Sequence, residues 1–437
     1  MKYYSTNHEA PEVSLREAVI KGLAPDKGLY MPFSIPTLPE QFFEQIDKKS
    51  FQEIAFTVAT ALFGEDIESG VLRTIVDDAL NFDVPAVKVT DKIYALELFH
   101  GPTLAFKDVG ARFMARLLRH FIHTDERGKV NVLVATSGDT GSAVANGFLG
   151  VKGIQVYVLY PNEKVSQLQE MQFTTLGDNI TAIAVNGTFD DCQSLVKKAF
   201  MDAELNKRMK LTSANSINLA RLLPQSFYYF YAYAQMKRLG VANRLVVCVP
   251  SGNFGNIAAG LIAWKMGLPI HRFIAANNRN DVFFKYLQTG HYEPRPSVAT
   301  IANAMDVGDP SNFARILALF DNDYNAIKSL ISGASYTDEE IKKTIQTAFR
   351  EHDYLLDPHG ACAYQALAEQ LKTDETGLFL ETAHPAKFRD TISGIIGKEP
   401  EIPVRLQAFM NGKKECLYLD NNFEQLKSFL LNELVRA

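Results

Sequence analysis

The sequence has few cysteines, and they are far apart. Its four cysteines stand at positions 192, 248, 362 and 416 and form no CxxC pair. This pattern argues against a zinc site and a disulfide framework, and it favours a reduced, cytoplasmic compartment. The nine histidines show no HExxH or other metal-ligand spacing, so we expect no bound metal.

Long apolar runs and a strong charge imbalance are also absent. No run reaches the about 18 residues needed to span a membrane, and the first residues lack the apolar stretch of a signal peptide. The formal net charge of -5 is small for 437 residues, so we expect neither nucleic acid nor an anionic membrane as a partner. The length predicts two or three globular domains.

From about residue 92 onward, short apolar runs alternate with helical patterns. The runs predict strands at 93–99, 130–135, 154–160, 180–185, 245–249, 271–276 and 377–381. Helical spacing predicts helices at 109–121, 142–149, 165–176, 219–239, 256–266, 312–320, 338–352 and 361–371. Strands that are apolar throughout and alternate with helices predict an α/β fold, with parallel sheets covered by helices on both faces. We expect an N-terminal subdomain at 1–90 and two α/β domains at 91–240 and 241–437.

The segment LFHGPTLAFKD ends a predicted strand and places Lys107 just before an amphipathic helix. Ala105 and Phe106 precede this lysine and can keep water from its amine. Desolvation disfavours the charged form of a lysine, and a neutral amine can form a Schiff base with a carbonyl cofactor. The other interpretation is a solvated lysine in the first helical turn, with Asp108 placed there to interact with the helix dipole.

The segment ATSGDTGSA at 135–143 follows a strand and opens a helix. Backbone N–H groups and the positive end of the helix dipole make such a junction an anion site. The hydroxyls of Thr136, Ser137 and Thr140 add hydrogen-bond donors. The other interpretation is a glycine turn in which Thr140 or Ser142 is the N-cap of the helix.

A third junction, PSGNFGN at 250–256, again leads from a strand into a helix. Its two glycines allow the backbone to wrap closely around an oxyanion. It contains neither the Gly-Lys-Ser/Thr of a Walker loop nor GxGxxG, so a dinucleotide fold is not favoured. The other interpretation is a tight turn. One lysine and two anion loops are together what an aldehyde cofactor with a phosphate tail and an anionic amino-acid substrate would require.

Four segments, FHGPTLAFKD, ATSGDTGSA, SGNFGN and ETAHPAKF, resemble the signature segments of the threonine synthase family and occur in that family's order. The N-terminal SLREAVIKGLAPDKGLYMP also resembles the family's opening, so the resemblance spans residues 4 to about 405. It implies a fold-type II pyridoxal-phosphate enzyme, related in architecture to the tryptophan synthase β subunit. We therefore expect two open, mostly parallel sheet domains with an N-terminal subdomain and the active site between the domains.

The resemblance also implies the roles of individual residues. Lys107 would carry pyridoxal 5'-phosphate as a Schiff base and act as a general base, and the hydroxyl of Thr382 would approach the pyridine nitrogen. The cofactor phosphate would be bound by Gly252, Asn253, Phe254, Gly255 and Asn256. The substrate carboxylate would be bound by Thr136, Ser137, Gly138, Asp139 and Thr140.

Other polar residues are left with two interpretations each. Candidates for binding the substrate phosphate, each of which fits a structural role better, are Asn215, Arg221, Asp309, Ser311, Asn312, Lys387 and Arg389. The histidines of the site segments, His100 and His384, fit a hydrogen-bonded structural role at least as well as catalysis.

The reaction implied by the resemblance converts O-phospho-L-homoserine and water into L-threonine and phosphate, the last step of threonine biosynthesis. The partner would be this small-molecule substrate, and the protein would be a cytoplasmic monomer or small homo-oligomer. Two alternatives stay open. Another fold-type II lyase, either a serine/threonine dehydratase or an O-phosphothreonine phospho-lyase, could keep the lysine and both loops. A non-catalytic binder of a phosphorylated metabolite would need the loops but not Lys107.

Overall fold

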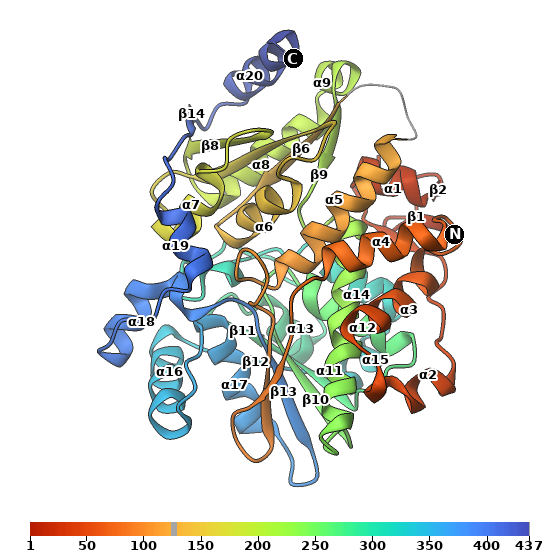
Figure 1. Cartoon of the computed structure of the whole chain (residues 1–437), viewed down its shortest axis with the longest axis vertical. Helices are drawn as coiled ribbons and strands as arrows, with labels where there is room; N and C mark the ends of the chain where they lie inside the picture. The colour runs from red at the N-terminus through yellow and green to blue at the C-terminus, as the bar shows by residue number, and fades with distance from the viewer. Residues whose placement is uncertain (124–128, 437) are drawn as a thin grey trace. The chain divides into compact units, whose positions relative to one another are not determined.

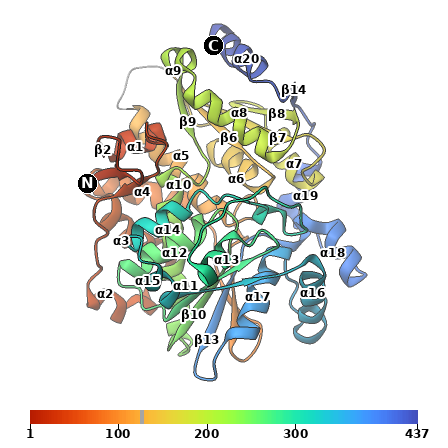
Figure 2. The same ribbon diagram turned by 180° about the vertical axis from the view of Figure 1, so that it is seen from behind.

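The computed structural model describes residues 1–123 and 129–436 and shows two compact units (Figures 1 and 2). Each unit is assembled from separate stretches of the chain. The first unit contains Met1, Met31–Phe106 and Leu222–Glu401, and the second contains Lys2–Tyr30, Lys107–Arg221 and the residues from Ile402 onward. The sequence boundaries that we expect after residues 90 and 240 cut the chain at other places, and they stay a prediction.

The first unit is built on a six-stranded sheet in the order β12-β11-β10-β13-β5-β4. Its strands are β4 (Ala86–Lys88), β5 (Ile93–Glu97), β10 (Leu245–Pro250), β11 (Arg272–Asn277), β12 (Ile331–Ser335) and β13 (Thr376–Glu381). Neighbouring strands are parallel, apart from the edge strand β4, which is antiparallel to β5. Burial on both faces explains why the central strands read as continuous apolar runs.

Helices cover both faces of this sheet. The helices and 3-10 turns are α2 (Glu40–Glu44), η1 (Ile46–Lys48), α3 (Phe51–Phe63), α4 (Ser69–Ala79), η2 (Leu223–Gln225), α11 (Ser226–Arg238), α12 (Gly255–Lys265), α13 (Val282–Thr289), η3 (Asn303–Met305), α14 (Phe313–Leu319), α15 (Tyr324–Leu330), α16 (Asp338–His352), α17 (Pro358–Gln370), η4 (Pro385–Phe388) and α18 (Arg389–Ile396). Ile274 shares a buried cluster with Ala361 of α17, whereas the next residue towards the N-terminus, Phe273, packs against Tyr229 of α11. Because neighbouring side chains of a strand point to opposite faces, α17 and α11 lie on opposite sides of the sheet.

The second unit has a five-stranded sheet in the order β14-β8-β7-β6-β9, and its described strand pairs are parallel. The strands are β6 (Val130–Ala135), β7 (Ile154–Pro161), β8 (Ile180–Asn186), β9 (Lys210–Ser213) and β14 (Leu417–Asp420). Its helices are α1 (Leu15–Lys21), α5 (Lys107–His123), α6 (Asp139–Phe148), α7 (Gln167–Thr174), α8 (Phe189–Met201), α9 (Ala203–Arg208), α10 (Leu219–Leu222), α19 (Val404–Met410) and α20 (Phe423–Arg436). Figure 1 shows α8 lying against this sheet. A short antiparallel pair, β1 (Lys2–Ser5) with β2 (Val13–Ser14), precedes α1, and β3 (Tyr30–Pro32) lies where the chain passes to the first unit.

The predicted strands and helices agree with these elements to within a few residues, with one clear error. The helix predicted at 219–239 is interrupted, because η2 separates α10 from α11. Pro224 lies within η2, and a proline has no N–H to continue a helical ladder. Of the helices that the structure describes, none is long and apolar enough to cross a membrane.

Candidate active site

A turn with an unusual backbone leads from β10 into α12. Phe254 occupies the N-cap position of α12 with a φ of 60°, and no side chain caps the helix. Phe254 is nevertheless buried, and its ring packs against Phe283 with the centroids 4.6 Å apart. A non-glycine residue held at positive φ costs roughly 1–3 kcal/mol and is typical of ligand-binding turns. The first turn of α12 therefore presents backbone donors and a positive dipole end to an anion.

Two tyrosine hydroxyls hydrogen-bond to the side chain of Asn256, in the first turn of α12. The hydroxyls of Tyr228 and Tyr229 both donate to its Oδ1, each at 2.7 Å. Burial raises the pKa of both phenols well above the ordinary value, so both remain neutral donors. The Nδ2 group of Asn256 is buried and has no hydrogen-bond partner among the described residues. A donor held in this way fits a phosphate oxygen.

Gly252 and Asn253 of the same turn are fixed by η3 and by the start of α14. A Cβ on Gly252 would lie 2.6 Å from the Cα of Met305 and 2.9 Å from the carbonyl oxygen of Ala304. The backbone N–H of Ser311 donates to Oδ1 of Asn253 at 2.7 Å. The turn therefore tolerates no side chain at position 252, and its backbone path is set before any ligand arrives.

The buried Arg315 is linked to this turn through Asn312. The Nη1 group of Arg315 donates to Oδ1 of Asn312 at 2.7 Å, and Nδ2 of Asn312 donates to the carbonyl oxygen of Asn253 at 3.0 Å. Burial lowers the pKa of Arg315 to about 9, so the guanidinium still carries its charge at neutral pH. A positive charge behind a turn rich in N–H donors adds to the attraction for an anion.

Thr382 follows β13 and lies beside the segment that ends at Phe106. The N–H of Phe106 donates to the carbonyl oxygen of Thr382 at 2.9 Å, and Ala105 forms an isolated antiparallel bridge with Ala383. Thr382 itself is buried, at 6% exposure. Its hydroxyl has no hydrogen-bond partner in the part of the chain that the structure describes, so it can still bond to a ring nitrogen. The residue that follows Phe106 in the chain is Lys107.

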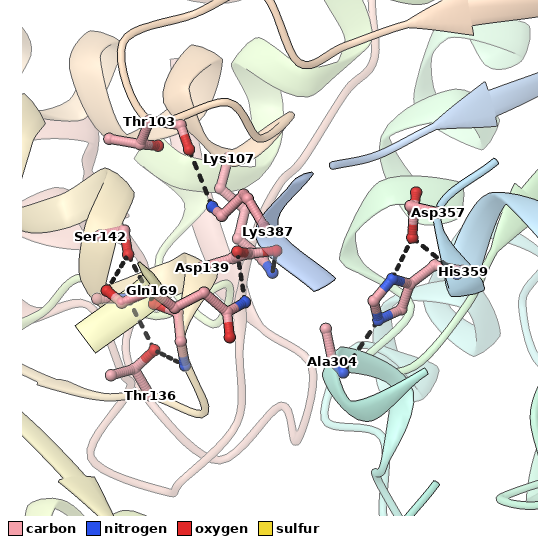
Figure 3. A network of polar contacts seen from close by, with 12 residues as sticks. Thr103, Lys107, Thr136, Asp139, Ser142, Gln169, Ala304, Asp357, His359 and Lys387 are labelled. Carbon is pink, nitrogen blue, oxygen red and sulfur yellow. Dashed lines mark hydrogen bonds and ion pairs between the residues drawn. The ribbon is translucent and has the colours of Figure 1, made fainter. Parts of the chain in front are cut away.

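Three buried titratable side chains join the end of β13 to the turn at Gly252. The backbone N–H of Asp357 donates to Oε1 of Glu381 at 2.6 Å, and Nδ1 of His359 lies 2.5 Å from Oδ1 of Asp357. The opposite ring nitrogen of His359, Nε2, accepts the N–H of Ala304 at 3.1 Å (Figure 3). Ala304 is the residue whose carbonyl oxygen packs against Gly252. This network could not be predicted from the sequence, because its members come from four separate stretches of the chain.

The surroundings of Glu381 favour the protonated form of its carboxyl group. Burial, and next the negative charge of Asp357, raise the pKa of Glu381 well above its ordinary value. Oε2 of Glu381 and Oδ2 of Asp357 are both buried without a hydrogen-bond partner among the described residues. Two carboxylate oxygens are both acceptors, so they can bond to each other only when one of them is protonated. A proton on Glu381 would allow a hydrogen bond between the two carboxyl groups.

In the second unit, Lys107 is the first residue of α5 and faces the SGDTG loop. Its Nζ lies 3.7 Å from Oδ2 of Asp139, with side-chain exposures of 15% and 3%. Oδ1 of Asp139 accepts from Nε2 of Gln169 at 2.8 Å. The lysine is thus largely buried, which favours the desolvated over the solvated interpretation of the sequence, and it has a carboxylate next to it, which the sequence did not indicate.

The SGDTG loop is shaped by Thr136. The Oγ1 atom of Thr136 accepts from the N–H groups of Gly138 and Gly141, at 2.9 Å and 2.8 Å. The alternative N-caps, Thr140 and Ser142, are wrong: α6 begins at Asp139, its N-cap is Gly138 with a φ of 140°, and no side chain caps it. The half-buried hydroxyls of Ser137 and Thr140 have no partner within the described ranges. This helix start can therefore also receive an anion.

The structure gives most of the other polar candidates partners inside the protein. Asn215 pairs with both backbone groups of Ala135, Arg221 is buried and donates to the carbonyl oxygen of Ala214, and Asp309 accepts from Tyr292. Lys387 donates to the carbonyl oxygen of Thr103 at 2.9 Å, and Arg389 forms an ion pair with Glu399. None of these contacts identifies a binding site for the substrate phosphate.

His384 is a cap and not an acid. Its Nδ1 accepts the N–H of Ala386 at 3.1 Å, at the start of η4. Burial, and next the charge of His100, lower the pKa of His384 to about 4. The ring is therefore neutral at neutral pH, which supports the structural interpretation. His100 bonds to Oε2 of Glu97 through Nε2 at 2.7 Å.

Comparison with known proteins gives one family over the length of the chain. The family described as "Threonine synthase N terminus" matches residues 2–80, "Pyridoxal-phosphate dependent enzyme" matches residues 77–381, and "Threonine synthase, C-terminal" matches residues 360–430. The threonine synthase of Haemophilus influenzae is 46% identical over 99% of this chain and 100% of its own length. That of Escherichia coli is 42% identical over 99% of this chain and 100% of its own length.

Solved structures agree with these matches. The crystal structure of the Escherichia coli threonine synthase has a TM-score of 0.94 and 42% identity, over 99% of this chain and 100% of that one. The pyridoxal-phosphate-bound threonine synthase of Brucella melitensis has a TM-score of 0.93 and 35% identity, over 100% of both chains. The expected α/β fold with open, mostly parallel sheets and the expected pyridoxal 5'-phosphate cofactor are both confirmed. The chain belongs to the threonine synthase family of pyridoxal-phosphate-dependent lyases.

Proposed function

We propose that this chain converts O-phospho-L-homoserine and water into L-threonine and phosphate. The observation that carries the proposal is the match to threonine synthases from end to end, which includes the N-terminal and C-terminal segments particular to that family. A dehydratase or a simple binder would need only the central part. We place the reaction in the cytoplasm and the protein as a monomer or small homo-oligomer, on the same family relationship.

Residues of the first unit are proposed to hold the cofactor. The N–H groups at the start of α12 and Nδ2 of Asn256 would bind the phosphate, and the hydroxyl of Thr382 would bond to the ring nitrogen. The cradle is formed by Gly252, Asn253, Phe254, Gly255 and Asn256. It fits a phosphate because its helix lacks a side-chain cap, one of its amide donors is unpaired, and its glycine has no room for a side chain.

Residues of the second unit are proposed to carry the proton transfers and the substrate contact. When bound, pyridoxal phosphate supplies an aldehyde that reacts with amines and a ring that stabilises negative charge on carbon. Lys107 would hold the cofactor through its amine and, once released, remove and return protons at the substrate carbons. The carboxylate of the substrate would lie at the start of α6, bound by Thr136, Ser137, Gly138, Asp139 and Thr140. Neutral hydroxyls and backbone N–H groups suit that carboxylate, because they bind it without adding charge.

The product tests the reaction. The full-length chain loaded with pyridoxal phosphate is incubated with O-phospho-L-homoserine in ¹⁸O-labelled water, and the amino acid is analysed by mass spectrometry. We expect L-threonine with the label in its hydroxyl group and one phosphate released per threonine. Formation of 2-oxobutyrate without threonine would show a dehydratase-type lyase, and the absence of any turnover by a cofactor-loaded protein would favour a binder.

The attachment point is tested separately. Borohydride reduction of the loaded protein, followed by peptide mass spectrometry, should find the cofactor on Lys107. Lys387 is the matched control, because it is also buried and lies in a site segment. A cofactor adduct on Lys387, or on any other lysine, would overturn the assignment of Lys107.

A further inference from the structure

We propose that Asp139 is a second catalytic residue, which holds the proton-carrying form of the Lys107 amine, and that Gln169 positions Asp139 for this task. The proposal rests on the proposed function of Lys107. It assigns a different task to Asp139 from the one implied by the family resemblance, in which the residue belongs to the substrate-carboxylate loop. It also gives a function to Gln169, which no sequence motif indicated.

The side chain of Asp139 contacts Lys107 on one side and Gln169 on the other (Figure 3). Nζ of Lys107 lies 3.7 Å from one carboxylate oxygen of Asp139, and the other oxygen accepts from Nε2 of Gln169 at 2.8 Å. Asp139 and Gln169 are exposed by only 4% and 1%. An ion pair that is screened so little by water acts strongly on the protonation of its members.

Gln169 is itself fixed in one orientation. The hydroxyl of Ser166 donates to its Oε1 at 3.1 Å, which leaves Nε2 to face Asp139. A Cβ on Gly138 would lie 2.6 Å from the Cδ of Gln169. The glycine before Asp139 is therefore required for this approach as well as for its φ of 140°, a conformation that L side chains rarely adopt.

The negative charge of Asp139 distinguishes its proposed role at Lys107 from binding of the substrate carboxylate. The side chain of Asp139 is a carboxylate, and a substrate carboxylate brought next to it would be repelled. The backbone N–H groups of the loop can bind the substrate without that conflict. The side chain is then available to Lys107, which changes its charge each time it takes or returns a proton.

The proposed proton transfers run between Lys107 and the substrate, and they return Lys107 to its starting state. The neutral amine of Lys107 takes a proton from a substrate carbon and becomes an ammonium group, and Asp139 stays ionised as its counter-ion. The ammonium group later returns that proton to carbon, and the amine is neutral again. No oxidant, reductant or further co-reactant takes part, and Asp139 itself never needs to be protonated.

Charged groups on α5 and on nearby elements of the second unit interact with other partners. On α5, Asp108 is buried and its charge raises the pKa of Arg221, which burial lowers to about 10 overall. On α7, Glu170 forms an ion pair with Lys414 at 2.7 Å. On α1, which also packs against α5, Lys21 and Glu17 pair with each other at 2.6 Å. The structure places the carboxylate of Asp139 beside Nζ of Lys107, at 3.7 Å.

The test measures how readily the amine of Lys107 loses its proton. The full-length chain, freed of cofactor, is labelled briefly with acetic anhydride over a series of pH values, and labelling of Lys107 is followed by peptide mass spectrometry. Only the neutral amine reacts. Loss of a nearby opposite charge shifts such an equilibrium by about one pH unit or more, so Asp139→Asn should lower the midpoint pH of labelling by at least about that amount. Gln169→Leu should lower it less, because the carboxylate remains but is no longer held towards Nζ.

Asp190→Asn is the matched control. Asp190 is also an acidic residue in the first turn of a helix of the second unit, but it is exposed. Its substitution should leave the midpoint unchanged. A folded Asp139→Asn protein with the midpoint of the parent would overturn the proposal. If Asp139→Asn does not fold, an unchanged midpoint in folded Gln169→Leu would overturn it equally.

Kinetics of the loaded enzyme give a second measurement. With O-phospho-L-homoserine, Asp139→Asn should lower kcat about tenfold or more, with a smaller change in KM, because the step affected is proton transfer and not binding. A rise in KM alone would return Asp139 to the substrate-binding role. The labelling experiment needs neither cofactor nor substrate, so it can fail while the proposed reaction stands, and the product analysis can fail while the ion pair stands.

Discussion

Nδ1 of His359 lies 2.5 Å from a carboxylate oxygen of Asp357, deep in the first unit. The contact fixes the ring: Nδ1 donates to the carboxylate, and Nε2 is left to accept the N–H of Ala304. Ala304 in turn packs against Gly252 in the proposed phosphate cradle. A histidine that touches no ligand is therefore expected to influence how tightly a ligand is held.

Replacing His359 with alanine should weaken cofactor binding. The loss of one buried hydrogen bond costs about 1–3 kcal/mol, and here it would free Ala304 to move relative to Gly252. We expect the Kd for pyridoxal phosphate, measured by absorbance titration, to rise roughly tenfold, with kcat at saturating cofactor nearly unchanged. His352→Ala is the control, because His352 is exposed on α16. An unchanged Kd in His359→Ala would show that η3 does not support the cradle.

Adding a single methyl group at Gly252 should have a larger effect. The new Cβ would lie 2.6 Å from the backbone of Met305, and overpacking of this kind costs about 1–3 kcal/mol. Because η3 cannot move without breaking its bond to His359, we expect the turn to shift and the Kd for pyridoxal phosphate to rise about tenfold or more. Gly394→Ala is the matched control, since nothing lies within 4 Å of its added Cβ. Equal affinity in the two variants would exclude the turn as the phosphate site.

The sequence indicated the fold well where local pattern determines it. The apolar run at 130–135 coincides with β6, and the helical pattern at 338–352 coincides with α16. The run is buried throughout, and the helix begins with a capping box at Thr337, so each is specified by neighbouring residues. Edge strands such as β12 and β14 were not predicted, because short edge strands carry weaker apolar patterns.

The supporting network of the candidate site could not be read from sequence in the same way. Asp357 meets Glu381 across 24 positions, and His359 meets Ala304 across 55, so only tertiary packing brings them together. One local feature marks this approach in the structure. Gly360 lies inside a helix, where glycine is unfavourable, and a Cβ there would come within 1.6 Å of Oε2 of Glu381. The predicted helix at 361–371 began one residue after Gly360, so this signal is visible only once α17 is known to begin at Pro358.

Glu381 should make the protein less stable as the pH rises. Its pKa is raised in the folded state by burial and by Asp357, whereas in the unfolded chain the carboxyl ionises near its ordinary value of about 4.3. Above that pH the unfolded state has lost the proton and the folded state has kept it. The free energy of unfolding then falls with pH, at up to about 1.4 kcal/mol per unit, until the folded pKa is reached. A glutamine does not titrate, and its amide can still donate to Asp357.

Glu381→Gln should therefore gain stability relative to the parent as the pH is raised from 5 to 8. Urea unfolding at several pH values measures the difference between the two proteins. Glu401→Gln, at an exposed position of the same unit, should show a difference that does not depend on pH. A constant difference for Glu381→Gln as well would mean that Glu381 is ionised in the folded protein.

His384 should have the opposite dependence. Burial lowers its pKa to about 4 in the folded state, while the unfolded chain binds the proton at about 6.5. As the pH falls from 6.5 towards 4, His384 becomes protonated in the unfolded chain but stays neutral in the folded protein. The free energy of unfolding therefore falls by about 3 kcal/mol in total. Above pH 6.5 this contribution is fully present.

His384→Asn removes the titration and keeps the cap, because the amide oxygen of asparagine can accept the N–H of Ala386 in place of Nδ1. We expect its stability relative to the parent to rise as the pH is lowered from 6.5 to 4, and to be constant above 6.5. The exposed His291, changed to asparagine, serves as the control and should show no such rise. If His384→Asn also shows none, the His384 ring takes up a proton in the folded protein, and its neutral role at the start of η4 is wrong.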